Sequence, residues 1–471
     1  MGVYENSFSI HHAIMLFNTS GNGRIMIFTT ILTLLLLLAS LTVIREYRRT
    51  KTLTPISLIS LGNILYMGVT PTLYHYFPDI VTIFEHYVSD TGMTVDEPGL
   101  IRVLLAAAVF QLVCFCVSLG GGRKRIHPDA INNKTILKAA IIVGWVLMSV
   151  GALGAVWLGL KYNGHPWGLY EISYIERVTL ARDNSLQAFM LLMGVYGATQ
   201  LIVAYLLSDR KKMAVMILLA MTLHGLGMKS KFPIIWVLVV FFVVAVGQRK
   251  QLLRLFLPIG FAVLILSTMS ILRGFENYAD LPEYVETHWD LLMATAVAPW
   301  NNDLPGPASI TYFALNSDVD YTVRPVTEIL WLMVPRFLYD RGPVLADLWA
   351  EKMLGIDYQP GLGFGWSSIC DGFLLLGWLG IALVAFVNAM LARYIDNLGT
   401  KDRRYGEFFM IVVYCSAPLF LFSFRQSLGG LIKQMLIMAV LLWLPTFYLA
   451  QKDDGVRLSF RPASRQRIKP W

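Results

Sequence analysis

Residues 25–44 form a run of twenty residues without a charged side chain. A helix of about twenty apolar residues spans the roughly 30 Å hydrocarbon layer of a bilayer. Comparable runs recur along nearly the whole sequence, and only 15% of the residues are charged, against about 25% in soluble domains. The alternating ten-residue pattern of an outer-membrane barrel does not occur. The sequence therefore predicts an all-α, polytopic integral membrane protein.

Hydropathy predicts about eleven membrane-spanning helices. We place them at 25–44, 55–77, 99–119, 137–160, 186–208, 213–228, 232–247, 255–272, 367–392, 407–424 and 431–450. This divides the chain into N-terminal spans in 1–272, a large loop in 273–366, C-terminal spans in 367–450 and a basic tail in 451–471. The positive cluster of the first run follows it instead of preceding it, so we expect a retained anchor and no cleaved signal peptide.

Basic residues gather in every second connection between the predicted spans. The clusters are Arg45, Arg48, Arg49 and Lys51; Arg123 to Lys138; Arg210, Lys211 and Lys212; Arg249 to Arg254; Arg393 to Arg404; and the tail from Lys452 to Lys469. Lysine and arginine favour cytoplasmic loops, so the N-terminus is expected outside and the C-terminus inside. The net charge of +8 then reflects proximity to anionic lipid headgroups, and no nucleic-acid partner is expected.

The loop 273–366 is expected on the outer, periplasmic side, and it is not a polar linker. It contains Trp289, Trp300, Trp331 and Trp349 together with apolar runs. Such a pattern is typical of amphipathic helices that lie on a membrane surface, and we expect two, near 283–298 and 322–338. Long ordered loops of this kind are commonly functional.

Several cations stand at the predicted outer ends of spans, against the usual charge bias. They are Lys229, Lys231, Arg273, Arg336, Arg341 and Arg425. Each one alone is explained by a long side chain reaching toward lipid headgroups. Together they indicate an anion site, because arginine offers a planar fork that binds phosphate in a bidentate manner.

Acidic groups near these cations are candidates for a general base. Asp371 follows the glycine-rich segment 361–368 and lies just inside a predicted span, where an acid either complements the helix dipole or serves chemistry. Asp340 and Glu276 are competing candidates. Asp318 and Asp320 are better read as solvated loop carboxylates than as metal ligands, so neither a metal nor a cofactor is expected. His224, within a span, is expected to be hydrogen-bonded inside the bundle.

Five short patterns, in this order and on this side, resemble the O-antigen polymerase (Wzy-type oligosaccharide repeat-unit polymerase) family. They lie within residues 213–450 and are the turn from Gly227 to Lys231, the segment Leu272-Arg273-Gly274, the segment from Val334 to Pro343, and the segments Gly363–Gly377 and Phe424–Ser427 around the later spans. Lys231 stands where the family usually has arginine, and Asp371 where it often has glutamate.

This resemblance implies a glycosyltransferase of the bacterial inner membrane that acts at the periplasmic face. It would transfer a growing O-antigen or exopolysaccharide chain from undecaprenyl pyrophosphate to an incoming lipid-linked repeat unit. Arg273 and Arg336, with Asp371 as base, would be catalytic, and Arg341, Arg425, Lys229, Lys231 and Asp340 would bind substrate. Membrane lipid, a chain-length regulator and a flippase are the implied partners. A ligase using the same carrier, a flippase or transporter of lipid-linked sugar, and a non-catalytic scaffold are the alternatives.

Overall fold

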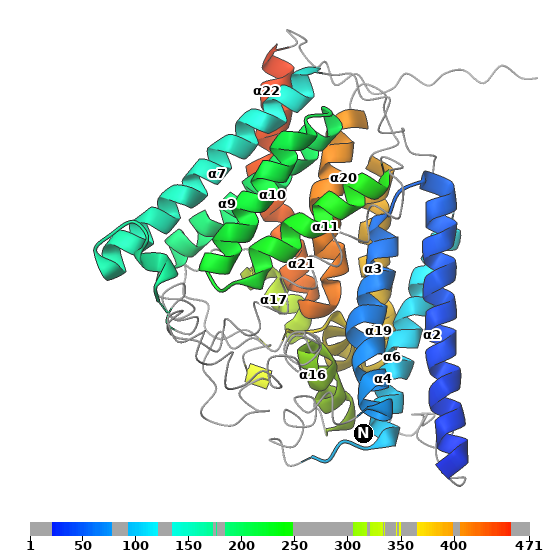
Figure 1. The fold of residues 1–471 in the computed structure, drawn as a ribbon. Helices are drawn as coiled ribbons and strands as arrows, with labels where there is room; N and C mark the ends of the chain where they lie inside the picture. Colours follow the sequence, from blue (N-terminus) through cyan, green and yellow to red (C-terminus); the bar gives the residue numbers. More distant parts are fainter. Residues whose placement is uncertain are drawn as a thin grey trace, which may run out of the picture.

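The computed structural model describes residues 21–77, 93–120, 134–172, 176, 184–247, 305–317, 321–332, 334, 345, 348–349, 365–398 and 406–453. Regular structure within these residues is helical throughout, as the sequence predicts (Figure 1). The helices are α2 (Gly21–Thr50), α3 (Pro55–Asn63), η1 (Ile64–Gly68), α4 (Val69–Tyr76), α6 (Glu97–Leu119), α7 (Lys134–Asn163), η4 (Gly168–Tyr170), α9 (Ser185–Leu207), α10 (Lys211–Gly227), α11 (Lys231–Gly247), α16 (Pro305–Asn316), α17 (Arg324–Leu332), α19 (Ser368–Leu398), α20 (Gly406–Leu421), η6 (Ser423–Arg425), α21 (Leu428–Met438), η7 (Ala439–Trp443) and α22 (Leu444–Asp453).

Seven helices among the described residues are long and apolar enough to cross a membrane. They are Gly23–Thr50, Pro55–Tyr76, Glu97–Leu119, Lys134–Asn163, Ser185–Leu207, Ser368–Leu398 and Leu428–Lys452. Lys231–Gly247 and Phe408–Leu421 are shorter apolar helices, and α10 covers most of the predicted span 213–228. The predicted span 255–272 lies outside the described residues. The finding is thus a membrane-type helical bundle with seven candidate spans in the described part of the chain.

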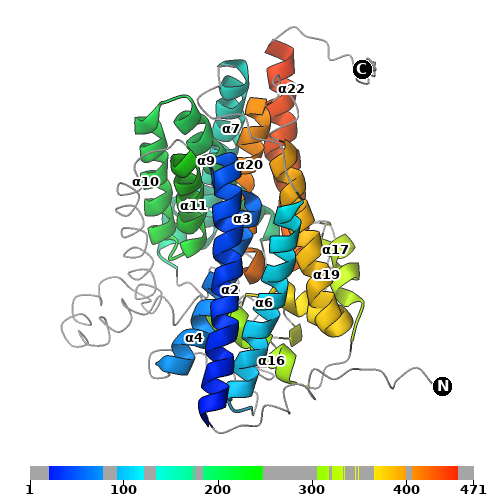
Figure 2. The ribbon, with the colours of Figure 1, turned by 90° about the vertical axis from the view of Figure 1, so that its right-hand side faces the viewer.

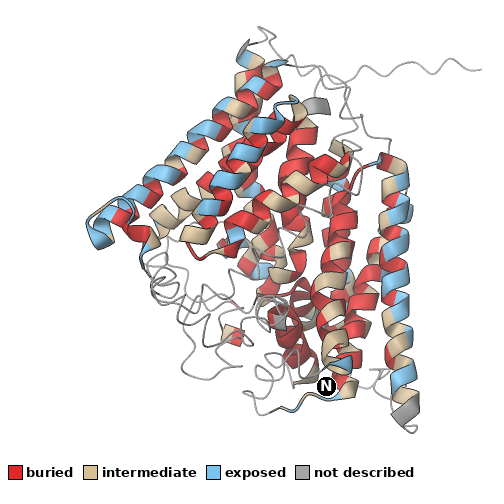
Figure 3. Ribbon diagram, in the orientation of Figure 1, coloured by how far each residue is buried: buried red, intermediate tan, exposed pale blue. Residues whose placement is uncertain are grey.

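The peripheral helices α2 and α7 expose apolar side chains over their outward surfaces. Leu37, Val146 and Leu153 are more than half exposed, and Figure 3 shows exposed residues along the outer sides of both helices. Water does not tolerate apolar surface of this extent on a soluble monomer. In a bilayer such side chains face hydrocarbon, and the helical backbone satisfies its own hydrogen bonds there.

Close packing inside the bundle depends on small residues, most clearly between α7 and α9. A Cβ atom added to Gly151 would lie 2.4 Å from the Cα atom of Gly194, so the two backbones touch. Helices in lipid gain little from hydrophobic exclusion and associate through such close contacts instead. Glycine at this crossing lets the helices approach, and any side chain would force them apart.

One end of the bundle, which we call the basic end, joins α2, α6 and α19 at their C-termini. Arg45 donates to the carbonyl oxygens of Ser118 and Leu119 at the end of α6. Arg49 bridges Glu46 and Asp396. Arg49 Nη2 lies 2.6 Å from Asp396 Oδ2, and Arg393 Nη1 lies 3.0 Å from Glu46 Oε1. The C-terminal ends of α2, α6 and α19, which the charge pattern predicts on the same side of the membrane, are therefore in contact.

Part of the predicted outer loop is packed into the bundle at the opposite end. The expected surface helix 322–338 is observed as the shorter α17, whereas 283–298 lies outside the described residues. The helix α16, which Figure 2 shows at this end, is not predicted by the sequence pattern. Its Tyr312 is buried and donates to Asp96 Oδ1 over 2.8 Å. Burial raises the pKa of Tyr312 well above its usual range, so the phenol stays protonated as the donor.

A polar network ties α2, α3 and α6 together within the apolar core. The amide nitrogen of Gln111 donates to Thr42 Oγ1 over 3.2 Å and to Ser60 Oγ over 2.9 Å, and Asn63 Nδ2 approaches Gln111 Oε1 at 3.4 Å. Hydrogen bonds between membrane helices contribute about 0.6 kcal/mol each on average. The network therefore fixes the register of three helices and contributes modestly to their stability.

Replacing Gln111 by leucine is expected to lower the free energy of unfolding by about 1–2 kcal/mol, because three interhelical contacts are lost. Thermal unfolding of the purified protein in detergent measures the effect. Cys116→Leu on the same helix is the matched control, since Cys116 is exposed on the bundle surface. Equal melting temperatures for Gln111→Leu and the wild type would contradict this role for the network.

Candidate functional site

Asp371 is the centre of a junction between chain segments that are distant in sequence, which we call the Asp371 junction. The indole nitrogen of Trp366 donates to Asp371 Oδ1 over 2.6 Å, and the backbone nitrogen of Leu428 donates to Asp371 Oδ2 over 2.6 Å. Asp371 is only 2% exposed. The carboxylate thereby fixes the start of α21 against the start of α19.

A break in α19 sets the turn that carries Asp371 apart from the rest of that helix. Leu376 and Gly377 have non-helical dihedral angles, and Gly377 has a φ of +60°. The backbone nitrogen of Thr322 donates to the carbonyl of Leu374 over 2.8 Å, which satisfies an acceptor that the break releases. The predicted span 367–392 is therefore interrupted by a kink that hydropathy does not reveal. The glycine at position 377 permits the positive φ.

Arg425 lies beside the glycine-rich segment that precedes α19. A Cβ atom added to Gly365 would lie 2.8 Å from Arg425 Cγ, and Gly365 has a φ of +73°. Ser368 Oγ donates to the carbonyl of Ser423 over 2.6 Å, so η6 is held against the first turn of α19. The structure therefore brings the segments that carry Arg425 and Asp371 into one junction, although the two residues are far apart in the sequence.

A second buried carboxylate, Glu328 of α17, belongs to the same neighbourhood. Its Oε1 atom accepts from Arg324 Nε over 3.2 Å and from the backbone nitrogen of Leu345. The helix α17 packs on α21, where a Cβ atom added to Gly429 would lie 2.8 Å from Leu332 Cδ1. Sequence reasoning missed Glu328. The i, i+4 spacing of Arg324 and Glu328 is the signal that was available.

Lys229 and Lys231 lie in the tight turn between α10 and α11, which we call the lysine turn. The backbone nitrogen of Lys229 donates to Leu226 O, and that of Ser230 donates to Gly225 O, each over 2.9 Å. These two bonds define a Schellman motif, in which the residue at the position of Lys229 is usually glycine. Lys229 has a φ of +45°, a left-handed conformation that costs a residue with a side chain about 1–2 kcal/mol.

Both lysines of this turn are buried, with Lys229 1% and Lys231 2% exposed. Lysine almost never becomes fully buried without a compensating interaction. Lys229 combines a buried position with a strained backbone, and such outliers cluster at functional sites.

Aromatic stacking connects the lysine turn to η6. Phe232 packs on Trp236 with ring centroids 4.9 Å apart, and Trp236 stacks on Phe422 at 6.1 Å. Lys231 precedes Trp236 by five residues, or about 7.5 Å along the helix axis. Arg425 follows Phe422 by three residues in the same direction away from the basic end. The lysine turn and the Asp371 junction therefore lie at the same end of the bundle, opposite the basic end.

The remaining predicted site residues, Arg273, Arg336, Asp340 and Arg341, lie outside the described residues. So do the alternative acids Glu276, Asp318 and Asp320. His224 is hydrogen-bonded within the bundle, as predicted, because its Nδ1 atom lies 3.0 Å from the hydroxyl oxygen of Tyr170. Of the eight predicted residues, the described part of the chain thus places Asp371 and Arg425 in one junction, with Lys229 and Lys231 in a turn at the same end of the bundle.

No protein-family model, no curated protein and no solved structure matches this chain.

Proposed function

We propose that this chain is a membrane glycosyltransferase of the polysaccharide-polymerase type. It would transfer a growing glycan from undecaprenyl pyrophosphate to an incoming lipid-linked repeat unit. The observation that carries the proposal is the gathering of buried cations and buried carboxylates at one end of the bundle, in Lys229, Lys231, Asp371 and Glu328, with Arg425 beside them. Ionisable groups are costly in such surroundings and usually serve a substrate.

The basic end supports an orientation with that end in the cytoplasm. Arg45, Arg49 and Arg393 lie there with the other lysine- and arginine-rich helix ends. Because positive loops favour the cytoplasm, the Asp371 junction and the lysine turn face the periplasm of a bacterial inner membrane. Lipid-linked glycans would then reach the site from the outer leaflet.

The chemistry that this site would perform is a substitution at a sugar carbon. The acceptor hydroxyl attacks the anomeric carbon of the donor glycan, and a new carbon–oxygen bond forms as the bond to the pyrophosphate oxygen breaks. The leaving pyrophosphate gains negative charge, which preformed cations stabilise. We assign this role to Arg425, Lys229 and Lys231, together with Arg273, Arg336 and Arg341.

The proton of the acceptor hydroxyl passes to a carboxylate. Each oxygen of Asp371 already accepts one hydrogen bond, but an ionised carboxylate offers about four acceptor positions. Asp371 therefore retains capacity to act as the base while it holds Trp366 and Leu428.

Glycan length in cells that lack the protein tests this function. Cells complemented with the wild type should carry long glycans, and cells without the protein should carry single repeat units. Arg425→Ala should shift the distribution toward single units. Lys161→Ala is the control, because this exposed lysine of α7 pairs with Asn184 and aromatic rings away from the junction.

Three outcomes would overturn the polymerase proposal. Long lipid-linked glycan that fails to reach its final acceptor would indicate a ligase. Lipid-linked single units trapped on the cytoplasmic side would indicate a flippase. Wild-type glycan length in the Arg425→Ala strain would indicate a scaffold without a catalytic site.

A further inference from the structure

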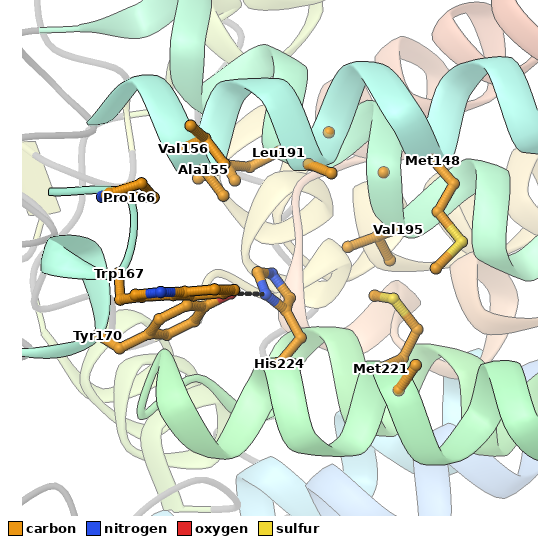
Figure 4. A pocket seen from close by; sticks show the side chains of 14 residues that line it. Met148, Ala155, Val156, Pro166, Trp167, Tyr170, Leu191, Val195, Met221 and His224 are labelled. Atoms are coloured by element: carbon orange, nitrogen blue, oxygen red, sulfur yellow. Dashed lines mark hydrogen bonds between the residues drawn. The ribbon is translucent and has the colours of Figure 1, made fainter. Parts of the chain in front are cut away.

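A pocket opens between α7, α9, α10 and η4, next to the lysine turn. Its volume is about 280 Å³, and Met148, Ala155, Leu191, Val195 and Met221 give it apolar walls. Figure 4 shows the hydrogen-bonded pair Tyr170 and His224 at one end of the pocket, with Met148 and Met221 at the other. The pocket is therefore apolar along its length and polar at a single end.

The pocket is accessible from the lipid-facing surface of the bundle. Ala152 and Ala220 belong to its lining and are exposed. Trp167 is 68% exposed and stacks on Tyr170 at the polar end, with ring centroids 6.5 Å apart. Tryptophan favours the interface between hydrocarbon and headgroups. The polar end thus lies at headgroup level, while the apolar end extends into the hydrocarbon.

The polar end lies against the last turn of α10, which leads into the lysine turn. A Cβ atom added to Gly227 would lie 2.6 Å from Tyr170 Cδ1, so the Tyr170 ring covers the last turn of α10. The backbone nitrogen of Met228 donates to His224 O over 2.9 Å, and Lys229 is the next residue. An apolar channel that ends beside two lysines matches a hydrocarbon chain that carries a phosphate.

We infer that this pocket binds the isoprenoid tail of the phosphate-linked lipid carrier and places its phosphate at Lys229 and Lys231. The inference rests on the proposed function. One pocket accepts one chain, which suits a single-chain isoprenoid phosphate better than a bilayer phospholipid with two chains. The flexible side chains of Met148 and Met221 adapt to the methyl branches of such a chain. The tail site would thus fix the register of the donor or acceptor lipid relative to Arg425.

Binding of undecaprenyl phosphate to the purified full-length protein tests this inference. Ala152→Phe fills the pocket and should raise the dissociation constant at least tenfold in native mass spectrometry or tritiated-ligand binding. Leu153→Phe is the matched control, because Leu153 is the next residue on α7, is 62% exposed and is not part of the pocket lining. It should bind as the wild type does.

Two results would overturn the tail site. One is equal binding of undecaprenyl phosphate by Ala152→Phe and the wild type. The other is equal competition by phosphatidylglycerol, which would show that the pocket holds an ordinary bilayer lipid. Neither depends on glycan synthesis. The tail site and the polymerase can also be separated. If Ala152→Phe abolishes carrier binding but glycan length in cells does not depend on the protein, the tail site stands and the polymerase proposal is refuted.

Discussion

Asp371→Ala is expected to remove long glycans and to lower the free energy of unfolding by about 2–5 kcal/mol. The substitution leaves two donors without an acceptor, the buried indole nitrogen of Trp366 and the partly buried backbone nitrogen of Leu428. An orphaned buried donor costs about 1–3 kcal/mol. The start of α21 would separate from the start of α19, and Arg425 would lose its position. Thermal unfolding in detergent and glycan length in complemented cells measure the two effects.

Two further variants separate the positioning role of Asp371 from a role as base. Trp366→Phe removes the indole donor itself and leaves no donor without an acceptor, so its loss of stability should be much smaller than that of Asp371→Ala. Asp371→Asn keeps the shape but loses the proton acceptor, and it should abolish long glycans with a smaller loss of stability. A wild-type melting temperature for Asp371→Ala would contradict the hydrogen-bonding argument.

The membrane-spanning helices were readable from the sequence because the information is local. An apolar run long enough to span a bilayer forms a helix wherever its neighbours lie. The ends were less readable. The predicted span 25–44 continues as a helix to Thr50, because Arg45 and Arg49 find partners on α6 and α19. Those partners are remote in sequence, and hydropathy carries no information about them.

The candidate site shows the same division between local and remote information. Asp371 and Arg425 were found as charges at span ends, yet their junction depends on a hydrogen bond between Asp371 and Leu428, 57 residues apart. The buried helix α16 was missed because it is short and neither strongly apolar nor clearly amphipathic. The left-handed conformation of Lys229 was also invisible, since a lysine gives no sign that it occupies a glycine position.

Lys229→Gly is expected to stabilise the fold slightly while it removes long glycans. Glycine relieves a left-handed conformation that costs about 1–2 kcal/mol for a residue with a Cβ atom, so the melting temperature should stay level or rise. The phosphate of the lipid carrier loses a buried cation, and the yield of long glycan should fall at least tenfold. Lys229→Arg keeps the charge and should retain polymer.

Asp209→Gly provides the matched control for this prediction. Asp209 lies two residues after the end of α9, with a φ of +57°. It has the same pair of backbone bonds, from Asp209 N to Leu206 O and from Arg210 N to Tyr205 O. Its side chain is 81% exposed, so its ion pair with Lys211 contributes little. Asp209→Gly should show the same small stabilisation and normal glycan length. If both variants behave alike in glycan length, Lys229 serves only the turn and the phosphate site fails; if they diverge, the buried charge itself is what synthesis requires.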